Sequence, residues 1–328
     1  MSWLTKLFLI ILALLLLILA GTIVYFFRFA HLRQSQVPDD LEREGPLWQG
    51  YKKMMDEGYA WLSEQKTEQV TITSFDGLKL RGTYLPVENA RACVILFHGY
   101  RSWGLRDFAP LLPFYAEHGL SSLVVDQRAC GESEGKYITF GIKERQDALH
   151  WARYVDQRFD GKLPIILDGI SMGATTVMMT ADLPLPDSVA GLISDCGYTS
   201  PHDIIAHCAK KWFNLPSFPL VDILSLVTKA VAGFGYRDCC TLDTLAHSSK
   251  PIFFIHGGAD DFVPTYMTEK NFLAAKNCKG KLIVPEAGHG LSYMKDMMGC
   301  RQALLTYVKQ ILEETGHGAQ KAEDPVSR

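Results

Sequence analysis

The 328-residue sequence has no excess of positive charge, because 33 Lys and Arg residues are balanced by 36 Asp and Glu residues and the formal net charge is -3. It also has no block rich in lysine and arginine. Proteins that bind nucleic acid usually present a concentrated basic surface to the phosphates. We therefore expect no nucleic-acid partner. The 48% hydrophobic content is sufficient to bury a full core.

Cysteine motifs are absent as well. The eight cysteines form no Cys-x-x-Cys pair, no Cys/His cluster and no compact disulfide spacing. We expect most of them to be buried thiols, and we expect neither a metal nor a cofactor. The cysteines are Cys93, Cys130, Cys196, Cys208, Cys239, Cys240, Cys278 and Cys300.

Charged residues are missing from Leu7 to Phe27, an apolar stretch of about 20 residues that is long enough to cross a bilayer as one helix. A cleaved signal peptide is the alternative, but its apolar region is usually about 7–15 residues long and ends in small residues. Because this stretch continues through bulky residues to Phe27, we expect an uncleaved, single-pass membrane anchor over residues 1–33.

Positive charges lie on both sides of this stretch, with Lys6 before it and Arg28 and Arg33 after it. The charge difference on which the positive-inside rule depends is therefore small. The very short segment before the apolar stretch favours an amino terminus on the cytoplasmic side of the membrane. We therefore expect the rest of the chain on the extracytoplasmic side. The sequence does not indicate an oligomeric state.

Residues 34–68 form a polar connector followed by a segment whose apolar residues recur at helical spacing. Its polar face mixes acids with lysines, which favours packing on the folded domain over lying on a bilayer. We expect this amphipathic helix to act as a stalk. Its apolar residues are Trp48, Tyr51, Met55, Tyr59 and Leu62.

Residues 69–315 alternate buried, strand-like runs with helical segments, which is typical of a parallel sheet with right-handed crossovers. An Asp-Gly step at residues 76–77 joins the first two runs as an antiparallel pair. We expect an α/β fold with about eight strands, about six of them parallel, and helices on both faces. A polar tail follows at 316–328. The predicted strands are 69–74, 78–85, 92–97, 122–125, 164–167, 191–195, 251–255 and 281–284.

One interval, about 197–245, is much longer than a plain crossover and has apolar residues of its own. We expect it to form a helical lid whose apolar face lines a substrate pocket, with a larger helix layer as the alternative. The lid residues expected to line the pocket are Trp212, Phe213 and Phe218.

The sequence Gly169-Ile170-Ser171-Met172-Gly173 follows a buried strand and matches Gly-x-Ser-x-Gly. This pattern places a serine on a sharp strand-to-helix turn, where its hydroxyl is exposed for attack. A serine hydroxyl needs a base, a group that orients the base, and donors for the oxyanion. His289 and Asp260 follow later strands in the required order, so we predict a triad of Ser171, Asp260 and His289.

Two other carboxylates could orient the base. Asp261 adjoins Asp260, and Asp195 ends the preceding strand. Asp168, within the strand before the serine, is expected to be hydrogen-bonded scaffold. His98 and His256 lie in His-Gly turns and are expected to be structural.

These motifs together resemble the α/β-hydrolase superfamily, in particular its membrane-anchored, esterase-like or lipase-like bacterial members, over about residues 69–313. The resemblance implies an oxyanion hole formed by the backbone N–H groups of Tyr100 and Met172, and a structural ion pair between Asp126 and Arg128. The motifs that carry it are His98-Gly99-Tyr100, Asp126-Gln127-Arg128 with Gly131-Glu132-Ser133, Gly169 to Gly173, His256 to Pro264, and Gly288-His289-Gly290.

The residues predict a serine hydrolase that cleaves carboxylic esters through an acyl-enzyme intermediate, without a cofactor. The apolar lid favours a small-molecule or lipid-like ester with hydrophobic parts. A serine peptidase or amidase would use the same triad, so that reading stays open. A catalytically inactive, membrane-tethered binding protein is the third alternative, although such proteins usually lack part of the triad.

Overall fold

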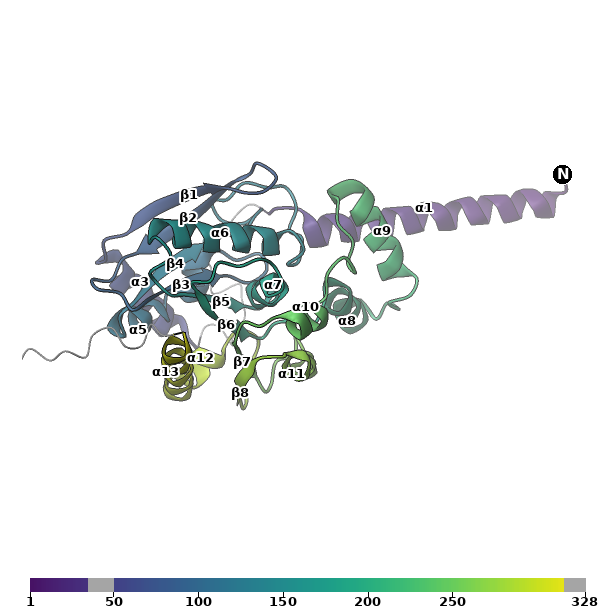
Figure 1. Cartoon of the computed structure of the whole chain (residues 1–328). Coiled ribbons are helices and arrows are strands. Elements are labelled where there is room, and N and C mark those ends of the chain that lie inside the picture. The colour runs from purple at the N-terminus through teal and green to yellow at the C-terminus, as the bar shows by residue number, and fades with distance from the viewer. Residues whose placement is uncertain (35–49, 316–328) are drawn as a thin grey trace, which may run out of the picture.

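The computed structural model describes residues 1–34 and 50–315, and they are organised around an eight-stranded sheet with the order β1-β2-β4-β3-β5-β6-β7-β8 (Figure 1). Strand β2 is antiparallel to both β1 and β4, and the pairs from β4 through β8 are parallel. The predicted α/β-hydrolase architecture is therefore confirmed. The strands are β1 Glu68–Thr73, β2 Lys79–Leu85, β3 Ala92–Phe97, β4 Leu120–Val125, β5 Ile165–Ile170, β6 Val189–Asp195, β7 Ile252–Gly257 and β8 Cys278–Val284.

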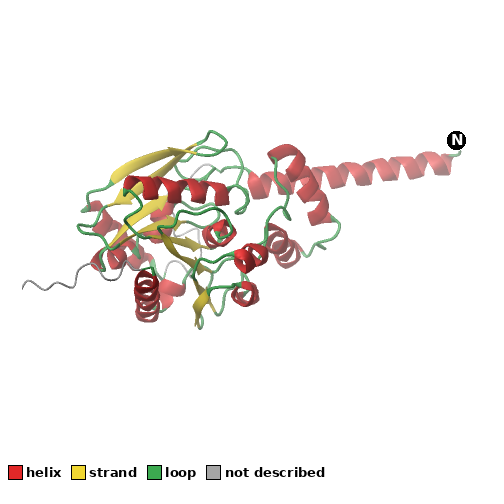
Figure 2. Ribbon diagram, viewed as in Figure 1, coloured by secondary structure: helices red, strands yellow, loops and turns green. Residues whose placement is uncertain are grey.

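Helices cover both faces of the sheet (Figure 2). The apolar side chains of β3 and its neighbours alternate between two clusters, one under each helix layer, which is why these strands read as unbroken apolar runs. One layer contains α6 Glu144–Arg158, α7 Met172–Thr180, α10 Thr241–His247 and α11 Thr265–Ala274. The other contains α3 Lys52–Ser63, α4 Gly104–Phe108, α5 Leu112–Glu117, α12 Ser292–Lys295 and α13 Met297–Glu314.

Two helical segments are interrupted. The segment from Leu105 to Glu117 divides into α4 and α5, because Pro110 has no N–H to donate and Pro113 lies in the first turn of α5. The segment at 294–314 divides at Asp296, whose side chain accepts a hydrogen bond from the N–H of Gly299 and so caps α13.

The amphipathic segment is a helix, α3, but it is not a stalk. It packs against α5, and its Gly58 lies against the backbone at Ala109 and Pro110. The long helix α1, Trp3–His31, instead meets the domain at the opposite end of the molecule (Figure 1). The stalk prediction is therefore wrong, because α1 contacts the domain directly. Most of the connector and the polar tail at 316–328 lie outside the described residues.

The predicted lid interval contains three helices with two different roles. Helices α8, Pro201–Phe213, and α9, Leu220–Ala232, pack against each other, and α9 also packs against α1. Helix α10 packs against α7 and α11, within the layer that covers the sheet. The lid is therefore shorter than the predicted interval of 197–245 and consists of α8 and α9. Helix α10, the third helix of the interval, belongs to the helix layer on the sheet.

Asp168 lies inside β5, three residues before Ser171 in the chain, and is nearly inaccessible to solvent. The hydroxyl of Tyr115 donates to its Oδ2 atom at 2.6 Å. Burial raises the pKa of Asp168 from 3.8 to about 7, with a smaller contribution from the neighbouring Asp195. The side chain has the hydrogen-bonded structural role that the sequence suggested, and burial makes its ionisation unfavourable.

This raised pKa predicts a pH-dependent effect of Asp168→Asn. The folded state retains a proton that the unfolded state loses, so the wild type loses stability as the pH rises from 3.8 to about 7. The variant keeps an acceptor for Tyr115 and cannot ionise. Its advantage in the free energy of unfolding should therefore grow over this interval to about 2–4 kcal/mol. Denaturant unfolding at pH 4, 5.5 and 8 measures it, and a pH-independent difference would contradict it.

Candidate active site

Ser171 occupies a strained turn between β5 and α7. Its φ is 56° and its ψ is -113°, a conformation that a residue with a side chain rarely adopts. Its N–H donates to the carbonyl of Asp195 at 2.8 Å, which fixes the turn to strand β6. The turn lifts the serine side chain off the end of the sheet, as a nucleophile elbow requires.

The two glycines of the motif are required by close backbone contacts. A Cβ atom on Gly169 would collide with the backbone of Gly173, and a Cβ on Gly173 would collide with the carbonyl of Phe97 at the end of β3. Helix α7 can therefore approach β3 closely only with glycine at 173. The pattern is a packing requirement as well as a sequence signature.

The side chains of Ser171, His289 and Asp260 form a continuous hydrogen-bonded row. His289 Nε2 lies 2.8 Å from Ser171 Oγ, and His289 Nδ1 lies 2.7 Å from Asp260 Oδ2. An ionised carboxylate only accepts hydrogen bonds, so Nδ1 carries the proton and Nε2 accepts from the serine hydroxyl. The structure thus brings together the three residues singled out from the sequence, in the tautomer that a general base needs.

Asp260 is held as a carboxylate by several donors. Its Oδ1 accepts from the N–H groups of Phe262 and Val263, both at 2.9 Å, and its Oδ2 lies 3.0 Å from Nε2 of His256. Burial alone would raise the pKa of Asp260, but the hydrogen bonds from His256 and His289 outweigh it and hold the pKa well below its usual value. The acid is therefore charged when it orients His289.

The alternative acids point elsewhere. The Asp261 side chain is 88% exposed and pairs with Lys211 at 3.2 Å. Asp195 is buried and accepts from the Ser292 hydroxyl at 3.2 Å. Within the described residues, neither carboxylate makes a hydrogen bond to His289.

His256 has a more specific position than the structural turn expected of it. Its Nε2 faces two acceptors, Asp260 Oδ2 and the carbonyl of Val263 at 2.9 Å, so this nitrogen carries a proton. Its Nδ1 lies 2.6 Å from the Thr268 hydroxyl. The ring thus links the loop after β7 to α11 and positions the acid of the triad.

The loop after β3 passes directly beside the serine. A Cβ on Gly99 would lie 3.5 Å from Ser171 Cβ. The Nδ1 atom of His98 lies 2.7 Å from the carbonyl of Gly99, while its Nε2 accepts from the N–H of Gln127. Because the Gly99 carbonyl and the Tyr100 N–H belong to one trans peptide group, fixing the carbonyl on His98 aims this N–H in the opposite direction.

The second predicted oxyanion donor is the N–H of Met172, the first residue of α7. The first N–H groups of a helix have no intrahelical acceptor, and they lie at the positive end of the helix dipole. Tyr100 and Met172 therefore come from separate elements that both adjoin Ser171.

The expected ion pair between Asp126 and Arg128 is not formed. Asp126 accepts from the N–H groups of Gly104 and Glu132, at 2.9 and 2.8 Å. The guanidinium of Arg128 instead makes two hydrogen bonds to Asp147 and two to Asp76. The prediction is wrong because backbone donors already occupy both oxygens of Asp126.

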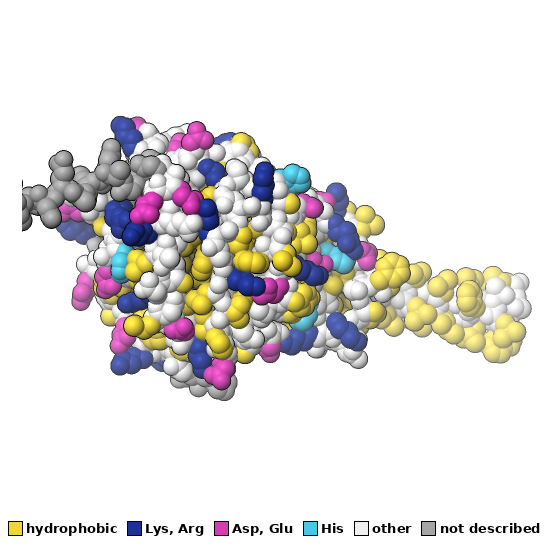
Figure 3. Space-filling view, turned by 60° about the horizontal axis from the view of Figure 1, so that its bottom comes forward, with side chains coloured by type: hydrophobic (Ala, Val, Ile, Leu, Met, Phe, Trp, Pro, Cys, Tyr) yellow, Lys and Arg dark blue, Asp and Glu magenta, His cyan; other side chains and the backbone are white. Residues whose placement is uncertain are grey.

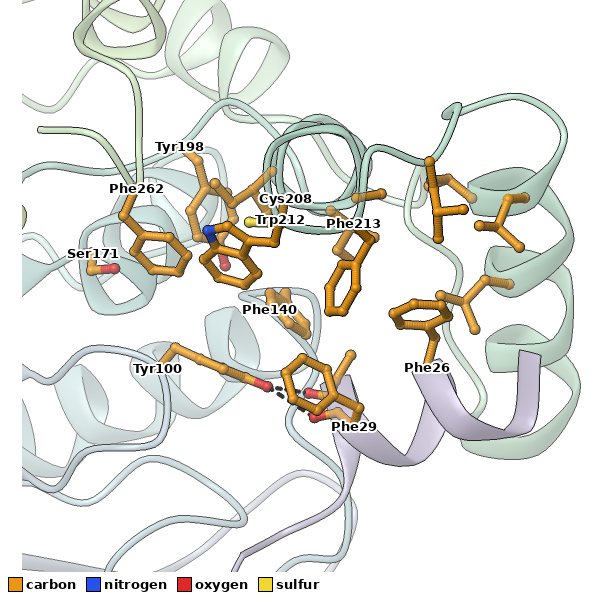
Figure 4. Close-up of a pocket in the computed structure, with 18 residues that line it drawn as sticks. Phe26, Phe29, Tyr100, Phe140, Ser171, Tyr198, Cys208, Trp212, Phe213 and Phe262 are labelled. Carbon is orange, nitrogen blue, oxygen red and sulfur yellow. Dashed lines mark hydrogen bonds between the residues drawn. The ribbon is translucent and has the colours of Figure 1, made fainter. Parts of the chain in front are cut away.

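An apolar cavity of about 800 Å³ extends from Ser171 toward α8, α9 and α1 (Figure 4). Trp212 and Phe213 line it, as predicted. Phe218 does not, and it is 76% exposed. Helix α8 ends at Asn214, whose left-handed conformation turns the chain away before Phe218 is reached.

A second cavity of about 540 Å³ borders Ser171 and His289 and has a more polar lining. Ser102, Arg106 and Asp107 contribute to it. Asp107 accepts from the N–H of Gly99 at 2.7 Å and from the Ser102 hydroxyl at 2.5 Å, so it also fixes the loop beside the serine. Ser171 therefore borders two spaces, one almost wholly apolar and one that also contains charged and hydroxyl side chains.

One group of side chains in the described ranges has the composition of a metal site, namely Cys196, Asp260 and His289. Burial raises the pKa of the Cys196 thiol well above its usual value, and metals bind the thiolate. Both ring nitrogens of His289 are already engaged by Ser171 and Asp260. The donor set does not fit a metal ion.

Two contributions to the site were missed in the sequence. Phe262, two residues after Asp260, lies edge-on to the His289 ring at 4.7 Å between centroids. Phe26 and Phe29 of α1 line the apolar cavity. Phe262 could have been found from its place in the motif. Phe26 and Phe29 could not, since they lie in or beside a run that hydropathy assigns to lipid.

The alpha/beta hydrolase family model matches residues 94–299, more than half of the chain, and the chain belongs to this family. An uncharacterised protein of Bacillus subtilis, YqkD, is 24% identical over 244 residues, which cover 74% of this chain and 80% of the relative. An uncharacterised membrane protein of Saccharomyces cerevisiae is 22% identical over 232 residues, covering 70% and 75% of the two chains.

Solved structures share the fold. The esterase Pf2001 of Pyrococcus furiosus superposes with a TM-score of 0.57 and 22% identity, covering 80% of this chain and 93% of that one. Est1E of Butyrivibrio proteoclasticus, with ferulic acid bound, has a TM-score of 0.58 and 19% identity, covering 74% and 99%. The family model confirms the predicted resemblance to the α/β-hydrolase superfamily, and these structures confirm the fold.

The contact between α7 and β3 predicts that Gly173→Ala destabilises the protein by at least about 3 kcal/mol, because backbone atoms cannot rotate out of the way. Thermal unfolding of the purified full-length protein in detergent measures this loss. Gly21→Ala is the matched control, since nothing lies within 4 Å of the added atom. Equal melting temperatures for the two variants would contradict the prediction.

Proposed function

We propose that the protein is a serine hydrolase that cleaves carboxylic esters through an acyl-enzyme intermediate. The observation that carries the proposal is the position of His289, which is hydrogen-bonded to Ser171 on one side and to Asp260 on the other. A histidine held in this way is a general base with its tautomer fixed. The apolar cavity beside the serine supports hydrophobic substrates.

In the first half-reaction, the Ser171 oxygen attacks the ester carbonyl carbon while its proton passes to Nε2 of His289. The N–H groups of Tyr100 and Met172 stabilise the negative charge that develops on the carbonyl oxygen, each contributing about 2.7–4 kcal/mol. The carbon–oxygen bond to the alcohol then breaks. The alcohol leaves with the proton from His289, and the acyl group stays on Ser171.

In the second half-reaction, His289 removes a proton from water, and the resulting hydroxide attacks the acyl carbon. The bond to Ser171 breaks, the serine regains its proton from His289, and a carboxylic acid is released. Asp260 stays ionised throughout and stabilises the imidazolium, as its low pKa allows. The alcohol and the acid together account for the atoms of one ester and one water.

Ester cleavage is favoured over amide cleavage by the likeness to a solved esterase and by the apolar lining of the larger cavity. One of the solved structures that share the fold, Pf2001, is an esterase, and another, Est1E, has ferulic acid bound. The lining of the larger cavity consists almost wholly of apolar side chains, which suits an acyl chain better than a peptide backbone with its hydrogen-bonding groups.

Replacing triad residues tests the proposed function. Ser171→Ala should lower hydrolysis of a p-nitrophenyl acyl ester by about 10⁴-fold or more, because it removes the hydroxyl that is hydrogen-bonded to Nε2 of His289. Asp260→Asn should lower kcat by about 10³–10⁴-fold, because an amide favours the wrong tautomer of the base. The rates are measured with full-length protein in detergent.

Asp261→Asn is the matched control for Asp260→Asn, because its exposed carboxylate should be dispensable. A fluorophosphonate probe should label the wild type and not Ser171→Ala. A folded wild type that is neither labelled nor active would point to an inactive binding protein, and turnover of p-nitroanilides above that of esters would point to an amidase.

We also propose that α1 is a retained membrane anchor with the hydrolase domain on the extracytoplasmic side. It is the one helix in the described chain long and apolar enough to cross a bilayer. Its last turns carry Ile23, Phe27 and His31, which are buried against the domain. Cleavage within this region would remove part of the folded unit.

This proposal predicts a mature protein that keeps its amino terminus and stays in the membrane fraction after carbonate extraction. Intact-mass measurement of purified protein checks the first point. A mass lower by about the first 20 residues would identify α1 as a signal peptide instead. Protease accessibility of the domain in intact cells tests its side of the membrane.

A further inference from the structure

The carboxyl end of α1 is built into the hydrolase domain. Ile23 and Phe27 belong to an apolar cluster with residues of α9 and the segment that follows it. His31 is fully buried, and its ring lies 2.6 Å from the Tyr236 hydroxyl and 2.9 Å from the Ile138 carbonyl. These contacts fix the direction in which the helix leaves the domain.

The same end of α1 contacts the loop that carries the proposed oxyanion donor. The Tyr100 hydroxyl donates to the carbonyl of Ala30 at 2.8 Å (Figure 4), and the Arg101 guanidinium donates to the carbonyl of Phe29. The last carbonyls of a helix have no intrahelical donor, so these two side chains supply what α1 lacks. The loop that carries Tyr100 is therefore joined to the end of α1 by hydrogen bonds.

Side chains of α1 complete the apolar cavity beside Ser171. Phe26, Phe29 and Ala30 line it opposite α8. The Phe26 ring packs edge-on against Phe213 of α8, with 4.9 Å between centroids. Without α1, this side of the cavity would have no wall.

Aromatic rings extend from the triad to α1 (Figure 4). Phe262 contacts His289, and Trp212 stacks on Phe262 with 5.3 Å between centroids. Phe213, the next residue, contacts Phe26. The apolar surface is thus continuous from the reacting groups to α1.

The surroundings of this cavity suit the boundary of a bilayer. The charge-free stretch of α1 ends at Phe27, so the cavity lies at the end of the segment that would cross the hydrocarbon. Hydrophobic side chains cover the projecting part of α1 (Figure 3). Beside it, α9 and the loop before it carry further exposed apolar side chains, namely Phe218, Leu226 and Val231.

We propose that the last turns of α1 form one wall of an acyl-binding site beside Ser171. The acyl chain of a membrane-resident ester enters this site from the bilayer and so brings the ester bond to Ser171. The proposal rests on the esterase function proposed above. The substrate class is a long-chain acyl ester of a small polar alcohol. The acyl chain lies between α1 and α8, against the apolar side chains that line the cavity.

The second cavity at Ser171 provides for the alcohol. Ser102, Arg106 and Asp107 line it together with His289. A leaving alcohol with hydroxyl groups finds donors and acceptors there, and it departs past the ring that protonates it. An apolar space and a second space with charged and hydroxyl side chains, both bordering the serine, fit an ester with a single long chain.

The test is a substitution that fills the cavity from α1. Ala30→Phe places a ring in the acyl path and keeps the backbone carbonyl that Tyr100 contacts. The matched control is Val24→Phe, which adds the same ring on a side chain of α1 that is 56% exposed. Full-length proteins are reconstituted in phosphatidylcholine vesicles. The substrates are 1-oleoylglycerol in the same vesicles and soluble p-nitrophenyl acetate.

Ala30→Phe should lower kcat/KM for oleoylglycerol at least tenfold more than for the acetate, while Val24→Phe should leave the ratio of the two values unchanged. Labelling of Ser171 by a small fluorophosphonate verifies that each variant is folded. If Ala30→Phe is not labelled, Phe26→Ser serves in its place, since a hydroxyl in the apolar wall should lower the same ratio.

The outcomes separate the two proposals. An unchanged ratio in a labelled variant overturns the acyl-site proposal, and so does a wild type that cleaves the acetate but not oleoylglycerol. A wild type that cleaves neither ester overturns the esterase function instead.

Discussion

The contact between Gly173 on α7 and the Phe97 carbonyl at the end of β3 determines the position of Ser171. This contact brings the first turn of α7 over the edge of the sheet, so that the serine adopts a positive φ and the Met172 N–H begins the helix beside it. The loop after β3 then passes so near the serine that a Cβ on Gly99 would contact it. The base and the acid follow β8 and β7, two strands whose carboxyl ends meet at the same edge.

The alternation of buried strands and helices was sufficient to predict the sheet, because a strand covered on both faces must be apolar throughout. Boundaries were less predictable. The division between α4 and α5 follows from Pro110, whose effect depends on where the helix packs. The amphipathic segment packs on the folded domain, as predicted, but its apolar pattern does not show which part of the domain covers it, and the stalk prediction failed for that reason. Here α5 covers the apolar face of α3.

The three residues of the candidate triad could be named because each lies in a short motif at a strand end. The predictions that Phe218 lines the pocket and that Asp126 pairs with Arg128 were wrong for a different reason. Their positions depend on a loop direction and on competing backbone donors, and neither leaves a local pattern. The role of α1 was hidden because side chains that face lipid and side chains that face a protein cavity have the same hydropathy.

The burial of Ile23, Phe27 and His31 has a practical consequence for how the protein is divided into parts. A hydropathy profile would set the start of a soluble fragment after residue 33, a few residues beyond the apolar stretch that ends at Phe27. Such a fragment would lose three side chains from its interior and expose Val221 and Phe234 to water. The folding unit therefore begins inside the apolar helix, and a fragment designed to be soluble would have to replace those last turns rather than omit them.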